Sequence, residues 1–182
     1  MKRCFWVNMN NPLYVDYHDN EWGVPKYDDH ELYELLILEM FQAGLSWETV
    51  LNKRENFRRA FDNFDWNKIV NYDEDKINVL MQDKGIIRNR RKIEAMINNT
   101  KIFLDIKKEY NTFANFIWSF TDNQVINVNS KVTSNELSDT ISKELKKRGM
   151  KFVGTVIIFS YLQAIGVINS HDKDCFKYDQ KN

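Results

Sequence analysis

Apolar side chains recur at helical spacing along almost the whole chain, and this feature restricts the fold most. The period-two alternation that marks a half-buried strand is not sustained anywhere. The chain also has only six glycines and two prolines among its 182 residues, which excludes turn-dense β folds and disordered chains. We therefore predict an all-α protein of about eight to nine helices, with irregular segments at 1–27 and 167–182.

Capping residues set the expected helix limits. Asp28 and Asp29 can cap a helix that ends at Ala43 and is closed by Gly44, and Ser46 reads as the cap of a helix running toward Phe61. The other helices are expected at about 66–71, 74–81, 88–110, 113–118, 135–148 and 154–166. Residues 121–135 are polar and aperiodic, so we expect one long loop there.

Charge and hydropathy restrict the partners and the cellular location that we expect for the protein. Basic and acidic residues number 26 each, so a nucleic-acid surface would have to be a local patch. The longest uncharged run, 152–170, contains polar residues such as Ser160 and Gln163 and is interpreted as a buried core helix, not a membrane span. The apolar run after Lys2 and Arg3 extends only from Cys4 to Val7, which is too short for the apolar region of a signal peptide. We expect a cytoplasmic protein without membrane contact.

Both cysteines and two of the three histidines lie in the irregular ends, as Cys4, His18, His171 and Cys175. Two thiolates and two imidazoles form the closed donor set of a structural zinc site, which would join the two ends into one lobe. One alternative is a pair of buried cysteines with two ordinary surface histidines. A second is a Cys4–Cys175 disulfide, which a cytoplasmic setting disfavours.

Glu39 lies on the apolar face of the predicted helix 29–43, whereas Glu31 and Glu34 are expected toward its polar side. An unpaired buried carboxylate is costly, so such a group either finds donors or shifts its pKa. Glu39 is then either paired with a core Arg, Tyr or Trp, or it is the acid of a ligand pocket. The residues that share its face are Leu32, Leu35, Leu36 and Ala43.

Five large aromatic residues accompany this acid within the first 47 positions. They are Trp6, Tyr14, Tyr17, Trp22 and Trp47, and most lie in or beside irregular segments. An acid surrounded by aromatic faces suits a planar cation or an electron-poor heterocycle, through stacking, cation–π attraction and hydrogen bonding. The alternative is an aromatic core cluster.

Two stretches are locally basic. The segment around Gly85 has the outline of a helix-hairpin-helix, in which the glycine lets the backbone approach a phosphate and the next helix offers free N–H groups. Such patches are typical of phosphate contact, although a charge run can also be a solvated face. The first stretch holds Lys84, Arg88, Arg90, Arg91 and Lys92 and no acid; the second holds Lys143, Lys146, Lys147, Arg148 and Lys151, with Glu144 its only acid.

Several motifs together resemble the 3-methyladenine DNA glycosylase I family of helix-hairpin-helix glycosylases, over essentially the whole chain. The motifs are Arg3-Cys4-x-Trp6-Val7, Tyr17-His18-Asp19-Asn20-Glu21-Trp22-Gly23-Val24-Pro25, Gln42-Ala43-Gly44-Leu45-Ser46-Trp47, Gly85-Ile86-Ile87-Arg88, and Lys147-Arg148-Gly149 with Lys151-Phe152-Val153-Gly154.

The resemblance implies a two-lobed, monomeric, monofunctional glycosylase that acts on double-stranded DNA containing alkylated bases and releases 3-methyladenine. The implied lobes are 28–150, with the hairpin, and 1–27 plus 151–182, with a structural Zn²⁺ on Cys4, His18, His171 and Cys175. Glu39, Tyr17 and Trp47 match the base pocket, and Tyr14, Trp6 and Trp22 are further expected wall residues. Glu39 is the expected catalytic residue, either by acting chemically or by binding the base. Gln42, Gly44 and Leu45 match the turn that probes the gap in the duplex, and Lys84, Gly85, Arg88 and Lys151 are the other expected DNA contacts.

Two rival functions fit the sequence less well. A non-catalytic DNA-binding module would use the same hairpin and metal, but phosphate binding alone needs no buried acid such as Glu39. A zinc hydrolase or deaminase is disfavoured, because the H-x-E and P-C-x-x-C signature of the deaminases is absent.

Overall fold

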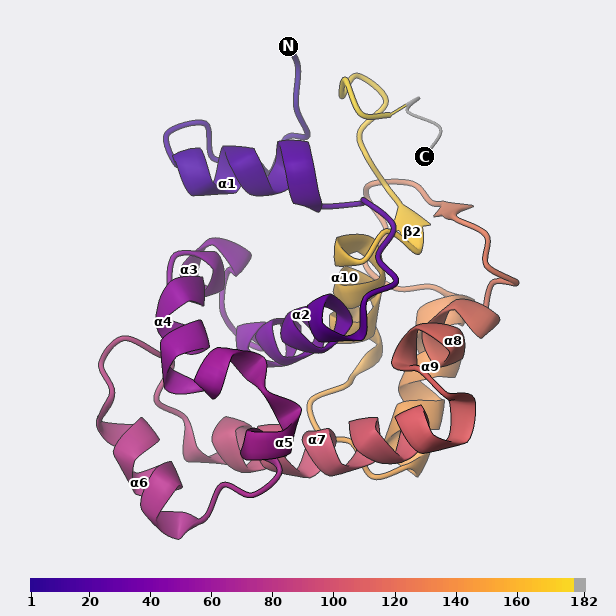
Figure 1. Cartoon of the computed structure of the whole chain (residues 1–182). Helices are drawn as coiled ribbons and strands as arrows, with labels where there is room; N and C mark the ends of the chain where they lie inside the picture. Colours follow the sequence, from indigo (N-terminus) through magenta and orange to yellow (C-terminus); the bar gives the residue numbers. More distant parts are fainter. Residues whose placement is uncertain (179–182) are drawn as a thin grey trace.

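A central helix, α2 (Asp29–Gln42), organises the fold (Figure 1). The computed structural model describes residues 1–178. All residues of α2 from Leu32 to Phe41 are buried, as expected of a helix that other elements surround. Its neighbours include α3 (Trp47–Leu51), α7 (Arg90–Tyr110) and α10 (Thr155–Ala164).

The predicted all-α class is confirmed. Before α2 lie α1 (Pro12–Asp16) and a π-helix, η1 (Tyr17–Glu21). The remaining helices are α4 (Arg54–Ala60), the 3₁₀ helix η2 (Asp62–Phe64), α5 (Trp66–Ile69), α6 (Glu74–Gln82), α8 (Phe113–Ser119) and α9 (Glu136–Lys147).

The helix starts follow the capping residues. The Asp28 side chain accepts hydrogen bonds from the N–H groups of His30 and Glu31, and Ser46 Oγ accepts one from Thr49. Asn135 begins α9 with a reciprocal capping box. Each cap satisfies N–H groups that have no partner inside the helix, so short polar residues mark these starts reliably.

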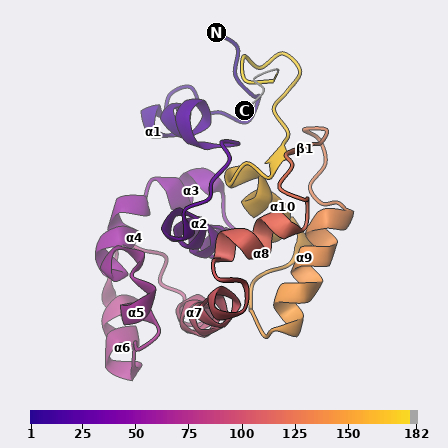
Figure 2. The same cartoon turned by 45° about the vertical axis from the view of Figure 1, so that its right-hand side comes forward.

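Two expectations about local structure were wrong, and a third was incomplete. The helix predicted from Ser46 toward Phe61 is two helices, because Lys53 leaves helical geometry at φ −102° and ψ 0°. Residues 1–27 are not wholly irregular, since they contain α1 and η1. The loop 121–135 contains β1 (Ile126–Asn127), which pairs in parallel with β2 (Ile168–Asn169) and so ties this loop to the C-terminal segment (Figure 2).

The uncharged run 152–170 forms a core helix as predicted. Its helical part, α10, has ten residues, with Ile158, Phe159 and Leu162 among the buried ones. Across residues 1–178, no helix combines the length and the apolar character that a bilayer crossing requires.

Candidate functional site

A cavity of about 260 Å³ brings together the acid and the five aromatic residues singled out in the sequence. The acid comes from α2, and the opposite sides come from α1, η1, α3 and the N-terminal segment. Gln42, at the end of α2, also lines the cavity. The cavity residues predicted from the sequence are Glu39, Trp6, Tyr14, Tyr17, Trp22 and Trp47.

Glu39 is the chemically unusual group of this cavity. Its side chain is buried, with 3% exposed. Its Oε2 atom and the Nε1 atom of Trp47 are the only buried side-chain nitrogen or oxygen atoms without a hydrogen-bond partner among residues 1–178. Burial raises the pKa of Glu39 to about 8, so the carboxyl group carries a proton at neutral pH. Two buried polar atoms in residues of one cavity therefore lack the hydrogen-bond partners that buried polar groups normally have.

The aromatic rings that line the cavity with Glu39 contact one another. Tyr17 and Trp47 have ring centroids 5.2 Å apart with planes tilted by 40°. Trp6 meets Trp22 edge to face at 4.8 Å and lies 5.3 Å from Tyr14. Burial, with Glu48 and Glu39 nearby, raises the pKa of Tyr14 to about 12, and burial also raises that of Tyr17. Both phenols therefore stay protonated and can donate a hydrogen bond.

Two further walls of the cavity were not predicted from the sequence. One is a face of α10 on which Val156, Ser160 and Gln163 are spaced i, i+4 and i+7. Two polar residues on one face of an otherwise apolar helix were the available signal. The other wall comes from the loop 121–135, whose lining residues are Ser130, Val132 and Thr133; no periodicity marks them.

Glu34 was expected toward the polar side of its helix, and the structure shows that this side is buried at Glu34. This residue is 4% exposed, and its Oε1 atom accepts from Arg54 Nε at 2.6 Å and from an Arg58 guanidinium nitrogen at 2.7 Å. Arg54 also donates to Glu21 at 2.7 Å. Because α2 is surrounded, even its charged face is covered, here by two arginines from α4.

The four predicted metal ligands form one buried cluster whose ligand atoms all lie within 4.8 Å of one another. Both cysteines are free thiols, so the disulfide alternative is wrong, and burial of both histidines excludes surface histidines. The sulfur to nitrogen distances are 3.4 Å for Cys4–His171, 3.5 Å for Cys175–His18 and 3.7 Å for Cys175–His171. This arrangement could hold a metal ion.

The metal cluster and the aromatic cavity share the π-helix η1. Tyr17 lines the cavity and the next residue, His18, belongs to the cluster. The Trp22 ring meets the His171 ring edge to face at 4.6 Å. Gly23 has φ +75°, and a Cβ atom there would lie 2.9 Å from His171 Nε2, so this position accommodates only glycine.

The turn between α2 and α3 exposes an apolar tip. The Leu45 N–H donates to the Gln42 carbonyl at 2.6 Å, and Gly44 has φ +79°. The Leu45 side chain, at 41% exposed, is one of the larger apolar side chains on the surface. Gln42 and Leu45 thus lie at either end of one tight turn beside the cavity.

The first basic stretch is divided in the structure. Arg90 pairs with Glu74 and Glu94, and Lys92 is buried. Within residues 1–178, no ion pair involves Lys84, Arg88 or Arg91.

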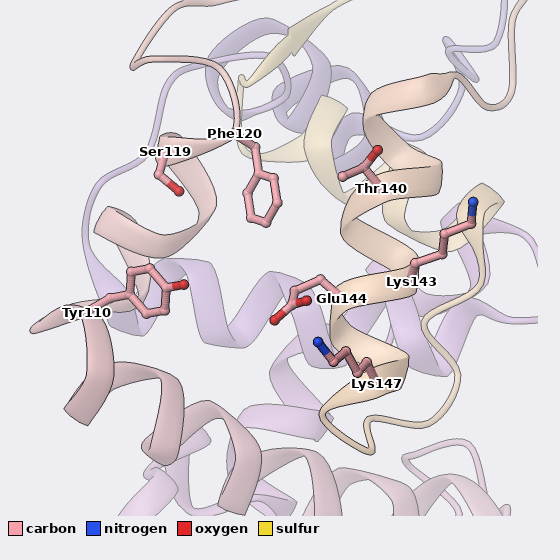
Figure 3. Close-up of a pocket in the computed structure, with 7 residues that line it drawn as sticks. All are labelled: Tyr110, Ser119, Phe120, Thr140, Lys143, Glu144 and Lys147. Atoms are coloured by element: carbon pink, nitrogen blue, oxygen red, sulfur yellow. The ribbon is translucent and has the colours of Figure 1, made fainter.

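The second basic stretch is partly neutralised. Arg148 donates to Glu109 at 2.6 Å and to Glu144 at 2.7 Å. Lys143 and Lys147 border an open hollow of about 470 Å³, into which Glu144 also projects (Figure 3). The other lining residues of this hollow are Tyr110, Ser119, Phe120 and Thr140. Lys151 lies in the turn between α9 and α10, where Asn99 binds its backbone N–H and C=O, each at 2.8 Å.

Fold and site together define a helical protein with an acid-bearing aromatic pocket. Comparison with known proteins gives the family. The methyladenine glycosylase family model matches residues 6–178, and the chain belongs to this family, as predicted.

Two curated relatives and two solved structures illustrate the match. DNA-3-methyladenine glycosylase 1 of Escherichia coli (strain K12) is 47% identical over 183 residues, covering 98% of this chain and 97% of the relative. The DNA-3-methyladenine glycosylase of Haemophilus influenzae is 43% identical over 178 residues, covering 95% and 96%. A crystal structure of 3-methyladenine DNA glycosylase I superposes with a TM-score of 0.92 at 48% identity, covering 96% of this chain and 98% of that one. Another, in complex with 3-methyladenine, gives 0.94 at 35% identity and covers both chains fully.

Proposed function

We propose that this protein is a monofunctional DNA glycosylase that hydrolyses the N-glycosidic bond of 3-methyladenine in alkylated double-stranded DNA and leaves an abasic site. One observation carries the proposal: the two buried polar side-chain atoms without partners in the described chain belong to Glu39 and Trp47, which line the same aromatic cavity. A flipped purine offers an aromatic face and a polar edge, which complement these walls. The names of the relatives support the same substrate.

Charge selects the damaged base over adenine. A methyl group on N3 makes the base in DNA cationic, whereas adenine is neutral. Ionising a carboxyl of pKa about 8 at pH 7 costs about 1.4 kcal/mol. A cation about 4 Å from the resulting carboxylate recovers about 4 kcal/mol at an effective dielectric of 20. Glu39 therefore ionises beside the methylated base and stays protonated beside adenine.

The reaction then needs little acid catalysis. The C1′–N9 bond breaks and its electron pair passes to the cationic base, which leaves as a neutral molecule. The sugar develops positive charge that the flanking phosphates stabilise, and water adds to C1′ and releases a proton. Because the departing base is neutral, the Glu39 carboxylate loses its counter-charge and regains a proton. Trp47 and Tyr17 hold the ring, and no lysine is assigned as a nucleophile.

We further propose that the Cys/His cluster holds a structural Zn²⁺. Tetrahedral zinc with ordinary Zn–S and Zn–N bonds sets S···N distances of about 3.5 Å, close to those between Cys4, Cys175 and the two histidines. The His18 Nδ1 atom is 2.8 Å from Asp19 Oδ1, the kind of carboxylate partner that orients zinc-bound histidines. The ion would supply folding energy and leave no position for catalytic water.

Two turns are proposed to contact the DNA backbone. The helix-hairpin-helix segment is α6–turn–α7, where Gly85 N–H donates to Asp83 Oδ1 at 2.7 Å and Lys84 and Arg88 lie at the surface. The α9–turn–α10 segment has a similar outline. There Lys151 is exposed, and α10 begins at Gly154 without a side-chain cap, which leaves N–H groups for an anion. Leu45, on the turn after α2, would fill the gap left by the flipped base.

The cavity also supports the two proposed lobes. Glu39 and Trp47 belong to 28–150, whereas Tyr17 belongs to 1–27 and Gln163 to 151–182. A pocket lined from both lobes lets the protein close around a base that reaches it from the duplex.

Chromatography of the bases released from methylated duplex DNA tests the function. The wild-type protein should release 3-methyladenine and no adenine. Glu39→Gln should slow release by about 100-fold, because the pocket loses its counter-charge to the cationic base. Glu31→Gln changes an exposed acid on the same helix and should not alter release. Duplex binding without any release by the wild-type protein would favour the non-catalytic DNA-binding module instead.

A further inference from the structure

Lys92 is buried at the start of α7 and contacts the end of another helix. Its side chain is 5% exposed. The Nζ atom donates to the carbonyl of Phe41 at 2.8 Å and to that of Ala43 at 2.6 Å. Both acceptors belong to the C-terminal end of α2, where carbonyl groups have no partner inside the helix.

The Lys92 ammonium group stabilises the C-terminal end of α2 and not the N-terminal end of its own helix, α7. The first turn of α7 contains no acid and three basic residues, although positive charge is unfavourable at a helix N-terminus. The last turn of α2 contains no basic residue, so Lys92 supplies the positive charge that its C-terminus favours. Burial lowers the pKa of Lys92, and no carboxylate in residues 1–178 forms an ion pair with it. The cation is thus held by two backbone carbonyls.

The two helix ends that Lys92 joins each continue into a turn. The end of α2 leads into the turn 42–45 with its exposed Leu45. The start of α7, capped by Asn89, follows the turn 83–89. That second turn is itself held in place, because Lys53 Nζ and Asn56 Nδ2 donate to the Gly85 carbonyl at 3.3 and 3.1 Å.

We propose that Lys92 is a positioning residue that fixes the turn 42–45 relative to the turn 83–89, so that both engage one DNA duplex at the same time. The inference rests on the proposed function, since it assigns the two turns to a common substrate. Lys92 touches neither the base nor the sugar. It acts through the backbone carbonyls that set where Gln42 and Leu45 stand.

A second lysine on α7 provides a matched control. Lys107 Nζ pairs with Asp29 Oδ2 at 2.9 Å, at the N-terminal end of α2, and lies 4.1 Å from the Trp66 ring centroid. Lys92 and Lys107 therefore connect the same two helices at opposite ends. A role limited to helix packing would make the two lysines equivalent, whereas the proposal gives only Lys92 an effect on the DNA.

The test compares Lys92→Met with Lys107→Met in the full chain. The probes are free 3-methyladenine, an undamaged duplex, and the same duplex with one tetrahydrofuran abasic site. In Lys92→Met, the preference for the abasic duplex over the undamaged one should fall by about tenfold, because the turn is misplaced. Affinity for free 3-methyladenine should stay within about twofold of wild type, and Lys107→Met should preserve both quantities. Amide hydrogen exchange at Gly44 and Leu45 should quicken only in Lys92→Met.

Four results would overturn the inference or its basis. If Lys92→Met keeps the wild-type preference for the abasic duplex, Lys92 has no positioning role. If Lys92→Met and Lys107→Met lose this preference equally, both lysines act only in helix packing. A wild-type protein that neither prefers the abasic duplex nor releases 3-methyladenine overturns the proposed function itself. If Lys92→Met does not fold, Lys92→Arg keeps the charge but not the compact ammonium. It should lower the preference by about threefold with normal free-base binding, and an unchanged preference in it would again refute the role.

Discussion

Two acids on α2, Glu34 and Glu39, lie just over one helical turn apart and are equally buried, yet their surroundings are opposite. Glu34 accepts from Arg54 and Arg58 and belongs to an ion-pair network with α4. Glu39 has an oxygen without any partner among the described residues and shares its cavity with aromatic rings. Burial of an acid is therefore no sign of a ligand site by itself, whereas burial without a donor is.

The largest expected effect is on the pH dependence of the free energy of unfolding, which should distinguish Glu39 from Glu34. The pKa of Glu39 rises from 4.5 to about 8 on folding, so folded protein binds a proton that unfolded protein releases between those values. The wild-type protein therefore loses stability as pH rises from about 4.5 to about 8. Glu39→Gln does not lose stability over this range, because it has no proton to release. At pH 9 its free energy of unfolding should exceed that of the wild-type protein by an amount on the order of 5 kcal/mol, and this difference should vanish by pH 4.

Urea unfolding at several pH values measures this gap. Tyr14, Tyr17 and Tyr161 are the titratable groups that sense Glu39, and burial raises the pKa of each phenol. Trp47→Phe alters the same cavity without a titratable group and serves as the control. A pH-independent difference between Glu39→Gln and wild type would mean that Glu39 is not held protonated by burial.

A change of opposite sign in the free energy of unfolding is expected at Glu34, whose carboxylate has hydrogen-bond partners. Glu34→Gln leaves the guanidinium groups of Arg54 and Arg58 without their buried counter-charge, so the free energy of unfolding should fall by about 3 kcal/mol. Release of 3-methyladenine by the folded fraction should stay within about threefold of wild type. Thermal and urea unfolding at pH 7 measure the first quantity, and chromatography the second. A stable Glu34→Gln with impaired release would reverse the roles assigned to the two acids.

The smallest effect concerns the second atom without a partner. Trp47→Phe removes the buried Nε1–H and keeps an aromatic face, so stability should rise or fall by no more than about 1 kcal/mol. Affinity for free 3-methyladenine should drop by about tenfold, because one donor to the base is gone. Fluorescence or calorimetric titration with the free base measures it. Unchanged affinity would mean that the Trp47 ring, and not its N–H group, holds the ligand.

The sequence predicted what short-range rules control. Asp28, Ser46 and Asn135 cap helices as expected, because a side-chain oxygen beside unpaired N–H groups acts locally. The all-α class followed from periodicity, and the four residues of the Cys/His cluster from their composition and compartment. The caps and the helical class need no knowledge of how distant segments meet, and the cluster, which joins the two ends of the chain, was predicted from residue types alone.

Features that depend on neighbouring elements escaped prediction. Glu34 sits on the charged face of α2, and nothing in its own segment indicates that α4 covers that face with two arginines. The α10 wall of the cavity, with Ser160 and Gln163, was interpreted as core because the helix is uncharged. Local patterns describe one helix at a time, whereas a site wall is a property of several helices together.

The π-helix η1 leaves the molecule unusually intolerant of changes in chain length. Tyr17 and His18 follow each other directly, one in the cavity and the other in the Cys/His cluster. Deleting or inserting a single residue just before them would rotate the Tyr17 side chain away from the cavity and the His18 side chain away from the cluster at the same time. Substitutions can damage the two sites one at a time, but an indel in this segment would abolish both, so homologues should keep the spacing of these residues.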